Sequence, residues 1–160
     1  MCIRDSSHNI AKVEDHVVHG KTCKCCVHRK GATRALGGDH SELATRFSSV
    51  GQPVLVPGDM GTASWVLAGP TKGGNDAFAS SCHGAGRQLS RTAARKSVDA
   101  RELIGRLEQQ RVHVRAKTPN VLSEEAPEAY KDVDDVVRLT ERAGLARPVA
   151  RLRPLAVIKG

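Results

Sequence analysis

Aromatic side chains are scarce in this 160-residue sequence: they make up 2% of it, as one Trp, one Tyr and two Phe. A core with so few large rings must be built mostly from Val, Leu, Ile and Ala. Sheets that bind RNA by stacking bases need several exposed aromatic residues on one face. The composition therefore argues against a base-stacking RNA-binding sheet.

Long apolar runs are also missing. No stretch approaches the roughly 20 apolar residues of a membrane-spanning helix, and the N-terminus lacks the apolar core of a signal peptide. The five cysteines are an odd number. Three of them, Cys23, Cys25 and Cys26, crowd into four positions, which suits reduced thiols better than a disulfide framework. These features predict a cytoplasmic protein without a membrane partner.

Positive charge is what the chain has in excess. Lys and Arg total 25 against 17 Asp and Glu, a formal net charge of +8. Such a balance favours polyanionic partners, either nucleic acid or nucleotide phosphates, without distinguishing between them.

The N-terminal residues fit none of the patterns that follow. We interpret residues 1–6 as a spurious or non-native start, because the chain opens at Ser7 without a preceding strand, cap or linker. Residues 7–160 contain no internal repeat or low-complexity segment. We therefore expect them to form part of one domain that begins in the middle of its fold.

Local patterns predict several elements. Alternation over residues 10–18, a turn at His19-Gly20 and an extended stretch to Val27 indicate a β-hairpin. Two β-branched strands are expected at 53–57 and 64–68, joined by a glycine-containing turn that lets the backbone approach a ligand.

Helices and the fold class follow from the remaining patterns. Asp99 and Asp132 are typical N-caps, and Gly144 is expected to end the second of these helices. The tail, residues 148–160, has extended character. Short strands with segregated helices predict an α+β fold of mixed short-strand sheets with flanking helices.

The segment 82–87, Cys-His-Gly-Ala-Gly-Arg, is the richest in chemistry. Its glycines leave backbone amides accessible, and the residues after it favour a helix, whose N-terminus binds anions. Arg87, Arg91 and Arg95 recur every four residues, which would align three guanidinium groups on one helical face. A histidine beside such a phosphate cradle, His83, can attack phosphorus or relay a proton. For the arginines alone, a solvated basic face is the alternative.

A cluster of histidines and cysteines between residues 16 and 28 suggests zinc. Its spacing, however, matches no usual set of paired zinc ligands. On a strand, Cys23 and Cys25 share one face and Cys26 and His28 the other, so the four do not converge easily. We favour small residues packed in a hairpin, and keep a small non-catalytic RNA- or zinc-binding module as the alternative function.

Taken together, five segments resemble, in order, the RtcB family of RNA-splicing ligases. They are HNIAKVE at 8–14, VHRKGATRA at 27–35, PGDMGTASWVL at 57–67, CHGAGR at 82–87 and LAVIKG at 155–160. The resemblance implies that residues 7–160 are the C-terminal portion of an RtcB-like catalytic domain, whose N-terminal part is absent.

The resemblance implies an RNA ligase that joins 3′-phosphate or 2′,3′-cyclic phosphate ends to 5′-hydroxyl ends, in tRNA splicing and RNA repair. It implies GTP as co-substrate and two Mn²⁺ ions. The histidine matching His83 would attack the α-phosphate of GTP, hold GMP as a phosphoramidate and pass it to the RNA 3′-phosphate, from which the 5′-hydroxyl displaces it. Implied partners are tRNA halves or broken RNA ends, an accessory activating protein and the missing N-terminal half.

Site residues follow by resemblance. His8 matches a manganese ligand, Arg87, Arg91 and Lys30 match phosphate- or RNA-binding positions, and Asp59 stands where relatives carry serine. Because the other metal ligands belong to the absent part, we expect this chain to be inactive by itself. The positions matching GTP or GMP contacts are Asn9, Pro57, Gly58, Asp59, Met60, Ser64, Gly84, Ala85, Gly86, Tyr130 and Lys159.

Overall fold

The computed structural model describes residues 9–160, so the predicted metal ligand His8 lies outside the described part of the chain. Residues 9–160 form four small sheets and four α-helices, which agrees with the predicted α+β class. No helix among them is both long and apolar enough to cross a membrane.

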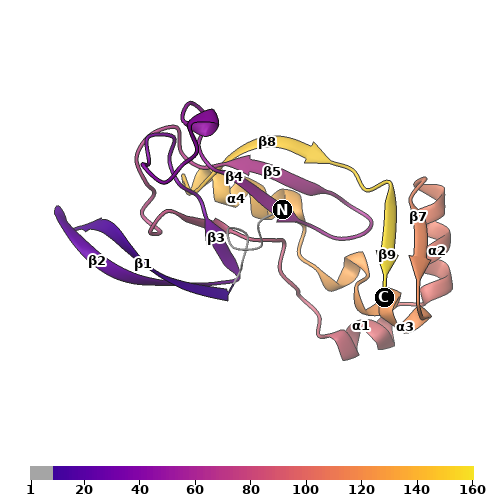
Figure 1. The fold of residues 1–160 in the computed structure, drawn as a ribbon. Coiled ribbons are helices and arrows are strands. Elements are labelled where there is room, and N and C mark those ends of the chain that lie inside the picture. The colour runs from indigo at the N-terminus through magenta and orange to yellow at the C-terminus, as the bar shows by residue number, and fades with distance from the viewer. Residues whose placement is uncertain (1–8) are drawn as a thin grey trace.

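The predicted hairpin is confirmed. Strands β1 (Asn9–Val18) and β2 (Lys21–Lys30) pair in antiparallel fashion and project from the rest of the molecule (Figure 1). The turn lies at His19 and Gly20, which both have positive φ. Two-residue hairpin turns need this conformation because it matches the twist of the strands.

A buried arginine attaches the hairpin to the body. The guanidinium of Arg29, 2% exposed, donates to the two carboxylate oxygens of Glu14 at 2.9 and 2.7 Å. It also donates to the Ser80 hydroxyl at 2.8 Å and to the Phe78 carbonyl at 2.7 Å. A buried charge is tolerated when it is paired and its donors are satisfied, as here. Ser80 begins the strand that leads to His83.

Two strands form a small pair between the hairpin and the main sheet. They are β3 (Ala32–Arg34) and β6 (Ser80–Cys82), which are antiparallel, with Ala32 opposite Cys82. The sequence patterns did not predict either one, since three-residue strands are too short to show a period.

The main sheet has the order β4-β5-β8, with strands at Pro53–Pro57, Ser64–Ala68 and Arg147–Leu152. The first two have the predicted bounds. Helix α4 (Val133–Arg142) lies against this sheet (Figure 1), and Gly144 ends it with φ +67°. The Asp132 carboxylate caps its N-terminus by accepting from the Asp134 amide at 2.7 Å. One apolar core lies between sheet and helix: Ala35, Val54, Val56, Ala63, Leu67, Ala85, Val133, Val137 and Ala146.

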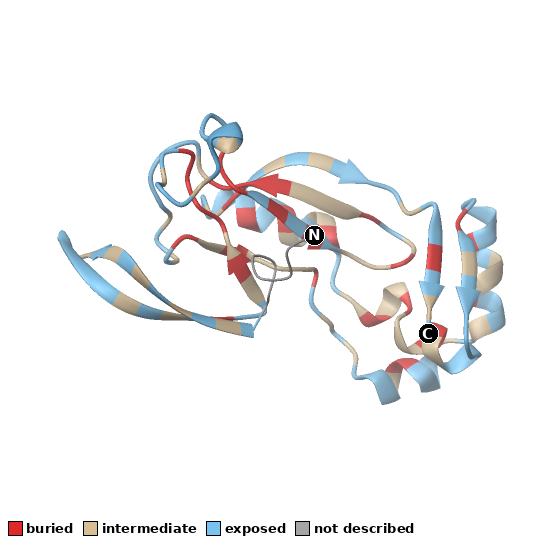
Figure 2. Cartoon of the chain, in the orientation of Figure 1, coloured by how far each residue is buried: buried red, intermediate tan, exposed pale blue. Residues whose placement is uncertain are grey.

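A second group of elements packs around its own core. Helices α1 (Arg91–Ser97), α2 (Ala100–Gln109) and α3 (Pro119–Glu124) lie near the parallel strands β7 (His113–Ala116) and β9 (Ala156–Lys159). Figure 2 shows buried segments in both groups. Two 3₁₀ turns, η1 (Thr45–Phe47) and η2 (Pro127–Ala129), complete the fold. The second core is Met60, Leu103, Leu107, Val112, Leu122, Ala126 and Val157.

Of this second group, the sequence predicted α2 and the extended tail that contains β9. The Asp99 carboxylate caps α2 by accepting from the amides of Arg101 and Glu102 at 2.8 and 2.9 Å. The elements α3 and β7 were not predicted, because a helix of 6 residues and a strand of 4 residues are too short to show a clear hydrophobic period.

Replacing Arg29 with alanine leaves the part-buried Glu14 without its main partner. We expect the free energy of unfolding to fall by about 3 kcal/mol, the size typical of a broken buried ion pair. Urea denaturation followed by the fluorescence of the single Trp, Trp65, measures the change. The matched control is Arg138→Ala, which breaks an exposed pair with Asp135 at 2.9 Å and should have little effect. Equal losses in the two variants would contradict the role of Arg29 in attaching the hairpin.

Candidate functional site

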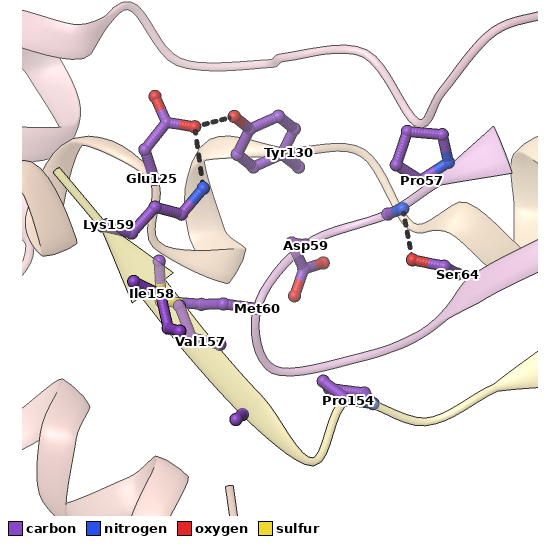
Figure 3. A pocket seen from close by; sticks show the side chains of 12 residues that line it. Pro57, Asp59, Met60, Ser64, Glu125, Tyr130, Pro154, Val157, Ile158 and Lys159 are labelled. Carbon is purple, nitrogen blue, oxygen red and sulfur yellow. Dashed lines mark hydrogen bonds and ion pairs between the residues drawn. The ribbon is translucent and has the colours of Figure 1, made fainter. Parts of the chain in front are cut away.

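A cavity of about 310 Å³ lies where the β4–β5 turn meets β9 (Figure 3). This volume falls at the lower end of the range for small-molecule sites. Seven of the residues predicted to contact GMP line it. Its lining residues are Pro57, Gly58, Asp59, Met60, Ser64, Glu125, Tyr130, Pro154, Ala156, Val157, Ile158 and Lys159.

The turn on one side of the cavity is held by its own polar groups. Asp59 Oδ1 accepts from the amides of Gly61 and Thr62 at 2.8 and 3.0 Å, and Oδ2 accepts from the Thr62 hydroxyl at 2.7 Å. Aspartate commonly closes turns in this way. The carboxylate at a position where relatives are expected to carry serine therefore has a structural role in this chain.

Gly58 is required by space rather than by backbone angle. A Cβ atom built on it would lie 2.0 Å from the carbonyl oxygen of Ala63. The Gly58 amide is 3.4 Å from the Ser64 hydroxyl, across the mouth of the same turn. The turn is thus closed on itself, and the cavity keeps its shape on this side.

The loop after β6 runs beside the cavity. His83 is half-buried and directly follows Cys82, the last residue of β6. The Ala85 amide donates to the Pro57 carbonyl at 3.0 Å, and the Lys131 amide donates to the Gly86 carbonyl at 3.0 Å. Pro57 lines the cavity, and Lys131 directly follows Tyr130, which also lines it. The loop is therefore fixed on two sides of the cavity, although its residues 83–86 are not among those that line it.

The sequence predicted a helix that begins directly after this loop, and this predicted start is wrong. Helix α1 begins at Arg91, and the Ser90 hydroxyl caps it by accepting from the Ala93 amide at 3.1 Å. Residues before the cap follow another course, because the amides of Gln88 and Leu89 donate to the Ala129 carbonyl at 2.8 and 3.2 Å. The loop therefore does not present a helix N-terminus to an anion, and Arg87 lies outside the helix.

The three arginines of the predicted stripe meet carboxylates. Arg87 Nη1 is 3.2 Å from Glu125 Oε1, and Arg91 Nε is 3.6 Å from the same oxygen. Arg95 Nε lies 3.5 Å from Glu124 Oε1. Although one helix does not align them, the end of α3 does bring the three together. Their contact with phosphate remains a prediction.

Glu125 is the centre of a polar network in the cavity wall. The Tyr130 hydroxyl donates to its Oε2 through a short hydrogen bond, and Lys159 Nζ lies 4.0 Å from that oxygen (Figure 3). Arg87 donates to the Tyr130 hydroxyl at 3.0 Å and lies over its ring, with Cζ 4.9 Å from the centroid. One carboxylate thus joins a tyrosine, a lysine and an arginine.

This network shifts two pKa values in opposite directions. Burial alone would raise the pKa of Glu125, but the Tyr130 hydrogen bond and the charges of Lys159 and Arg87 outweigh it, so the pKa of Glu125 is lowered. The pKa of Tyr130 is raised, first by burial and then by the hydrogen bond and charge of Glu125. At neutral pH the wall therefore presents an ionised carboxylate and a neutral phenol.

Other predicted site residues lie on the hairpin. Asn9 Oδ1 is 3.1 Å from His28 Nε2, and Lys30 is exposed opposite Asn9. Cys26 is exposed on the outer face while Cys25 lies on the half-buried inner one, as the strand period predicts. In residues 9–160, no three His, Cys, Asp or Glu side chains form a group that could hold a metal ion.

Sequence reasoning missed Glu125 and the apolar wall from β9. Glu125 follows Glu124 in a segment without any motif, so no spacing marked it. Its only indirect signal was that Tyr130 and Lys159 both match GMP contacts, since a cation close to a phenol can share an anionic partner.

Comparisons with known proteins all indicate the same family. A family model described as "tRNA-splicing ligase RtcB" matches residues 1–160. The chain is 51% identical over 158 residues to a tRNA-splicing ligase RtcB of Archaeoglobus fulgidus and 52% identical to one of Thermococcus kodakarensis, covering 99% of this chain and 33% of each relative. It is 51% identical to an RNA-splicing ligase RtcB of Mycobacterium tuberculosis, over 98% of this chain and 36% of the relative. The chain thus spans about a third of the length of these relatives.

Adding a methyl group at Gly58 should distort the turn beside the cavity. Gly58→Ala places a Cβ against the Ala63 carbonyl, so we expect a loss of about 2 kcal/mol in the free energy of unfolding, as for an overpacked site. Thermal and urea denaturation measure it. Gly74→Ala is the matched control, since nothing lies within 4 Å of its Cβ. If Gly58→Ala were as stable as the control, the turn would not be the closed one described.

Proposed function

Since this chain belongs to the RtcB family of tRNA-splicing ligases, we propose that it provides the guanylate pocket and the nucleophile of an RNA ligase. The ligase would join RNA 3′-phosphate or 2′,3′-cyclic phosphate ends to 5′-hydroxyl ends, using GTP. Its RNA substrates would be tRNA halves or broken RNA ends. The α+β arrangement would then be the C-terminal portion of the family fold.

The cavity is the observation that best supports this proposal. Seven residues expected to contact GMP come from three distant parts of the chain and line a single cavity. The loop that begins at His83 is bonded to Pro57 on one side and to Lys131, next to Tyr130, on the other. A nucleotide in the cavity would therefore lie beside the histidine loop.

The histidine chemistry can be written with its atoms balanced. A neutral imidazole nitrogen of His83 would donate its lone pair to the α-phosphorus of GTP, forming the P–N bond as the P–O bond to pyrophosphate breaks. The ring then gives up its N–H proton to solvent. The RNA 3′-phosphate oxygen would next attack the same phosphorus, and the P–N bond would break as the ring takes a proton back from solvent. Finally, the 5′-hydroxyl oxygen would attack the 3′-phosphate, lose its proton to solvent and release GMP.

The other residues of the site would position the substrate. Lys159 and Tyr130 would bind the base end of the nucleotide, and the closed turn at residues 58–62 would shape the wall beside it. Arg87 and Arg91 would bind phosphate oxygens, for which their forked donors are suited. To do so they must exchange carboxylate partners for phosphate ones.

The described residues alone do not provide a site for the two Mn²⁺ ions that the resemblance implies. Residues 9–160 bring no set of three metal-ligating side chains together, and His8 lies outside them. Any manganese site would need His8 and ligands beyond residues 9–160.

Guanylation of His83 tests the proposal directly. We would incubate GTP labelled at the α-phosphate and Mn²⁺ with the 160-residue chain and with a chain restored by a relative's N-terminal part. Acid-labile label should appear on the restored chain and little or none on the 160-residue chain. His83→Ala should abolish it, because the substitution removes the proposed nucleophilic nitrogen.

His40→Ala is the matched control, since His40 is half-buried like His83 but lies outside the 310 Å³ cavity. It should keep its label. Label that survives His83→Ala would rule out the proposed nucleophile, and an unlabelled restored chain would rule out the ligase.

A further inference from the structure

Glu125 is the one charged side chain in the cavity wall that the expected nucleotide contacts do not include. It is 20% exposed and lies at the end of α3, where its two oxygens face different partners. Oε2 accepts from Tyr130 and lies 4.0 Å from Lys159 Nζ, whereas Oε1 lies 3.2 Å from Arg87 Nη1. Each of these partners is itself expected to bind the nucleotide.

These contacts limit how far the lysine can move. Lys159 lies on β9, its side chain is 36% exposed, and a four-carbon stem has many rotamers in the absence of a partner. An ionised carboxylate beside the ammonium restricts them. Figure 3 shows Lys159 and Tyr130 both directed toward Glu125 at one end of the cavity. The Lys159 ammonium therefore lies beside the Glu125 carboxylate before any ligand binds.

We propose that Glu125 is a positioning residue that sets the guanine preference of the pocket by holding the Lys159 ammonium and the Tyr130 hydroxyl in place. This inference rests on the proposed nucleotide-binding function. Glu125 acts through its two partners and does not itself need to touch the base.

The preference follows from hydrogen-bonding chemistry. An ammonium is a donor only, with no acceptor. Guanine presents two acceptors, O6 and N7, on one edge, whereas adenine replaces O6 with an amino donor. A lysine held in one place thus favours guanine, and one that is free to turn away from an amino group discriminates less. Preorganisation of this kind raises affinity by lowering the ordering cost on binding.

The contact itself can be tested without any nucleotide. Tyr130 is the only tyrosine of the chain, so the absorbance of tyrosinate against pH reports its ionisation alone. Because the hydrogen bond and charge of Glu125 raise the pKa of Tyr130, Glu125→Gln should move the titration midpoint to lower pH. Glu141→Gln, at an exposed position on α4, should not move it. An unchanged midpoint in Glu125→Gln would overturn the inference.

The positioning role is tested by calorimetric binding of GMP, IMP and AMP to the 160-residue chain. IMP retains O6 and N7 but lacks the 2-amino group, so it separates action through Lys159 from direct contact with the base. We expect Glu125→Gln to weaken GMP and IMP by the same factor, about tenfold, and to leave AMP unchanged. A larger loss for GMP than for IMP would mean that Glu125 binds the 2-amino group itself, which overturns the positioning role.

A double-mutant cycle completes the test. In a Lys159→Ala background, Glu125→Gln should cause no further loss of the GMP-to-AMP ratio, because both changes remove the same interaction. Additive losses would overturn the inference. If the unchanged chain failed to bind GMP, the guanylate pocket itself would be overturned. GMP binding with an unaltered ratio in Glu125→Gln would instead overturn this inference alone.

Discussion

The β4–β5 turn is the constraint on which the rest of this structure depends. Met60 at its tip packs in the core of α2, α3 and β9, whereas Ala63 at its end packs in the core beneath the main sheet. A chain with few aromatic residues has two small cores in place of one large one, and this short turn links them. Because Asp59 bonds within the turn, the turn keeps its shape between the two cores. The cavity is the space at their junction.

Elements with a local cause could be predicted from the sequence. The hairpin, β4, β5 and the helices capped by Asp99 and Asp132 depend on alternation, β-branching or a capping side chain, each visible within ten residues. The α+β class follows from their order. The grouping of Pro57, Tyr130 and Lys159 had no local signal and came from family resemblance, which the shared cavity supports.

What could not be predicted depends on contacts between distant segments. The spacing of Arg87, Arg91 and Arg95 suggested one helical face, but Ser90 caps α1, and the amides of Gln88 and Leu89 before it bond to Ala129. The carboxylates that receive the arginines belong to another helix. Glu125 had no motif because its role is defined by three partners, Arg87, Tyr130 and Lys159, of which only Tyr130 is near it in the chain.

The cavity also has a kinetic consequence. Two of its walls come from residues 57–64 and from residues 154–159, which meet where Met60 and Val157 pack in one apolar core. Bringing these two segments together closes a long loop of the chain. The lost chain entropy is offset only once the packing around the cavity is complete. The hairpin and capped helices rest on local contacts, so we expect them to form before this cavity does. An incompletely folded chain would thus have its secondary structure before it had any place for a ligand.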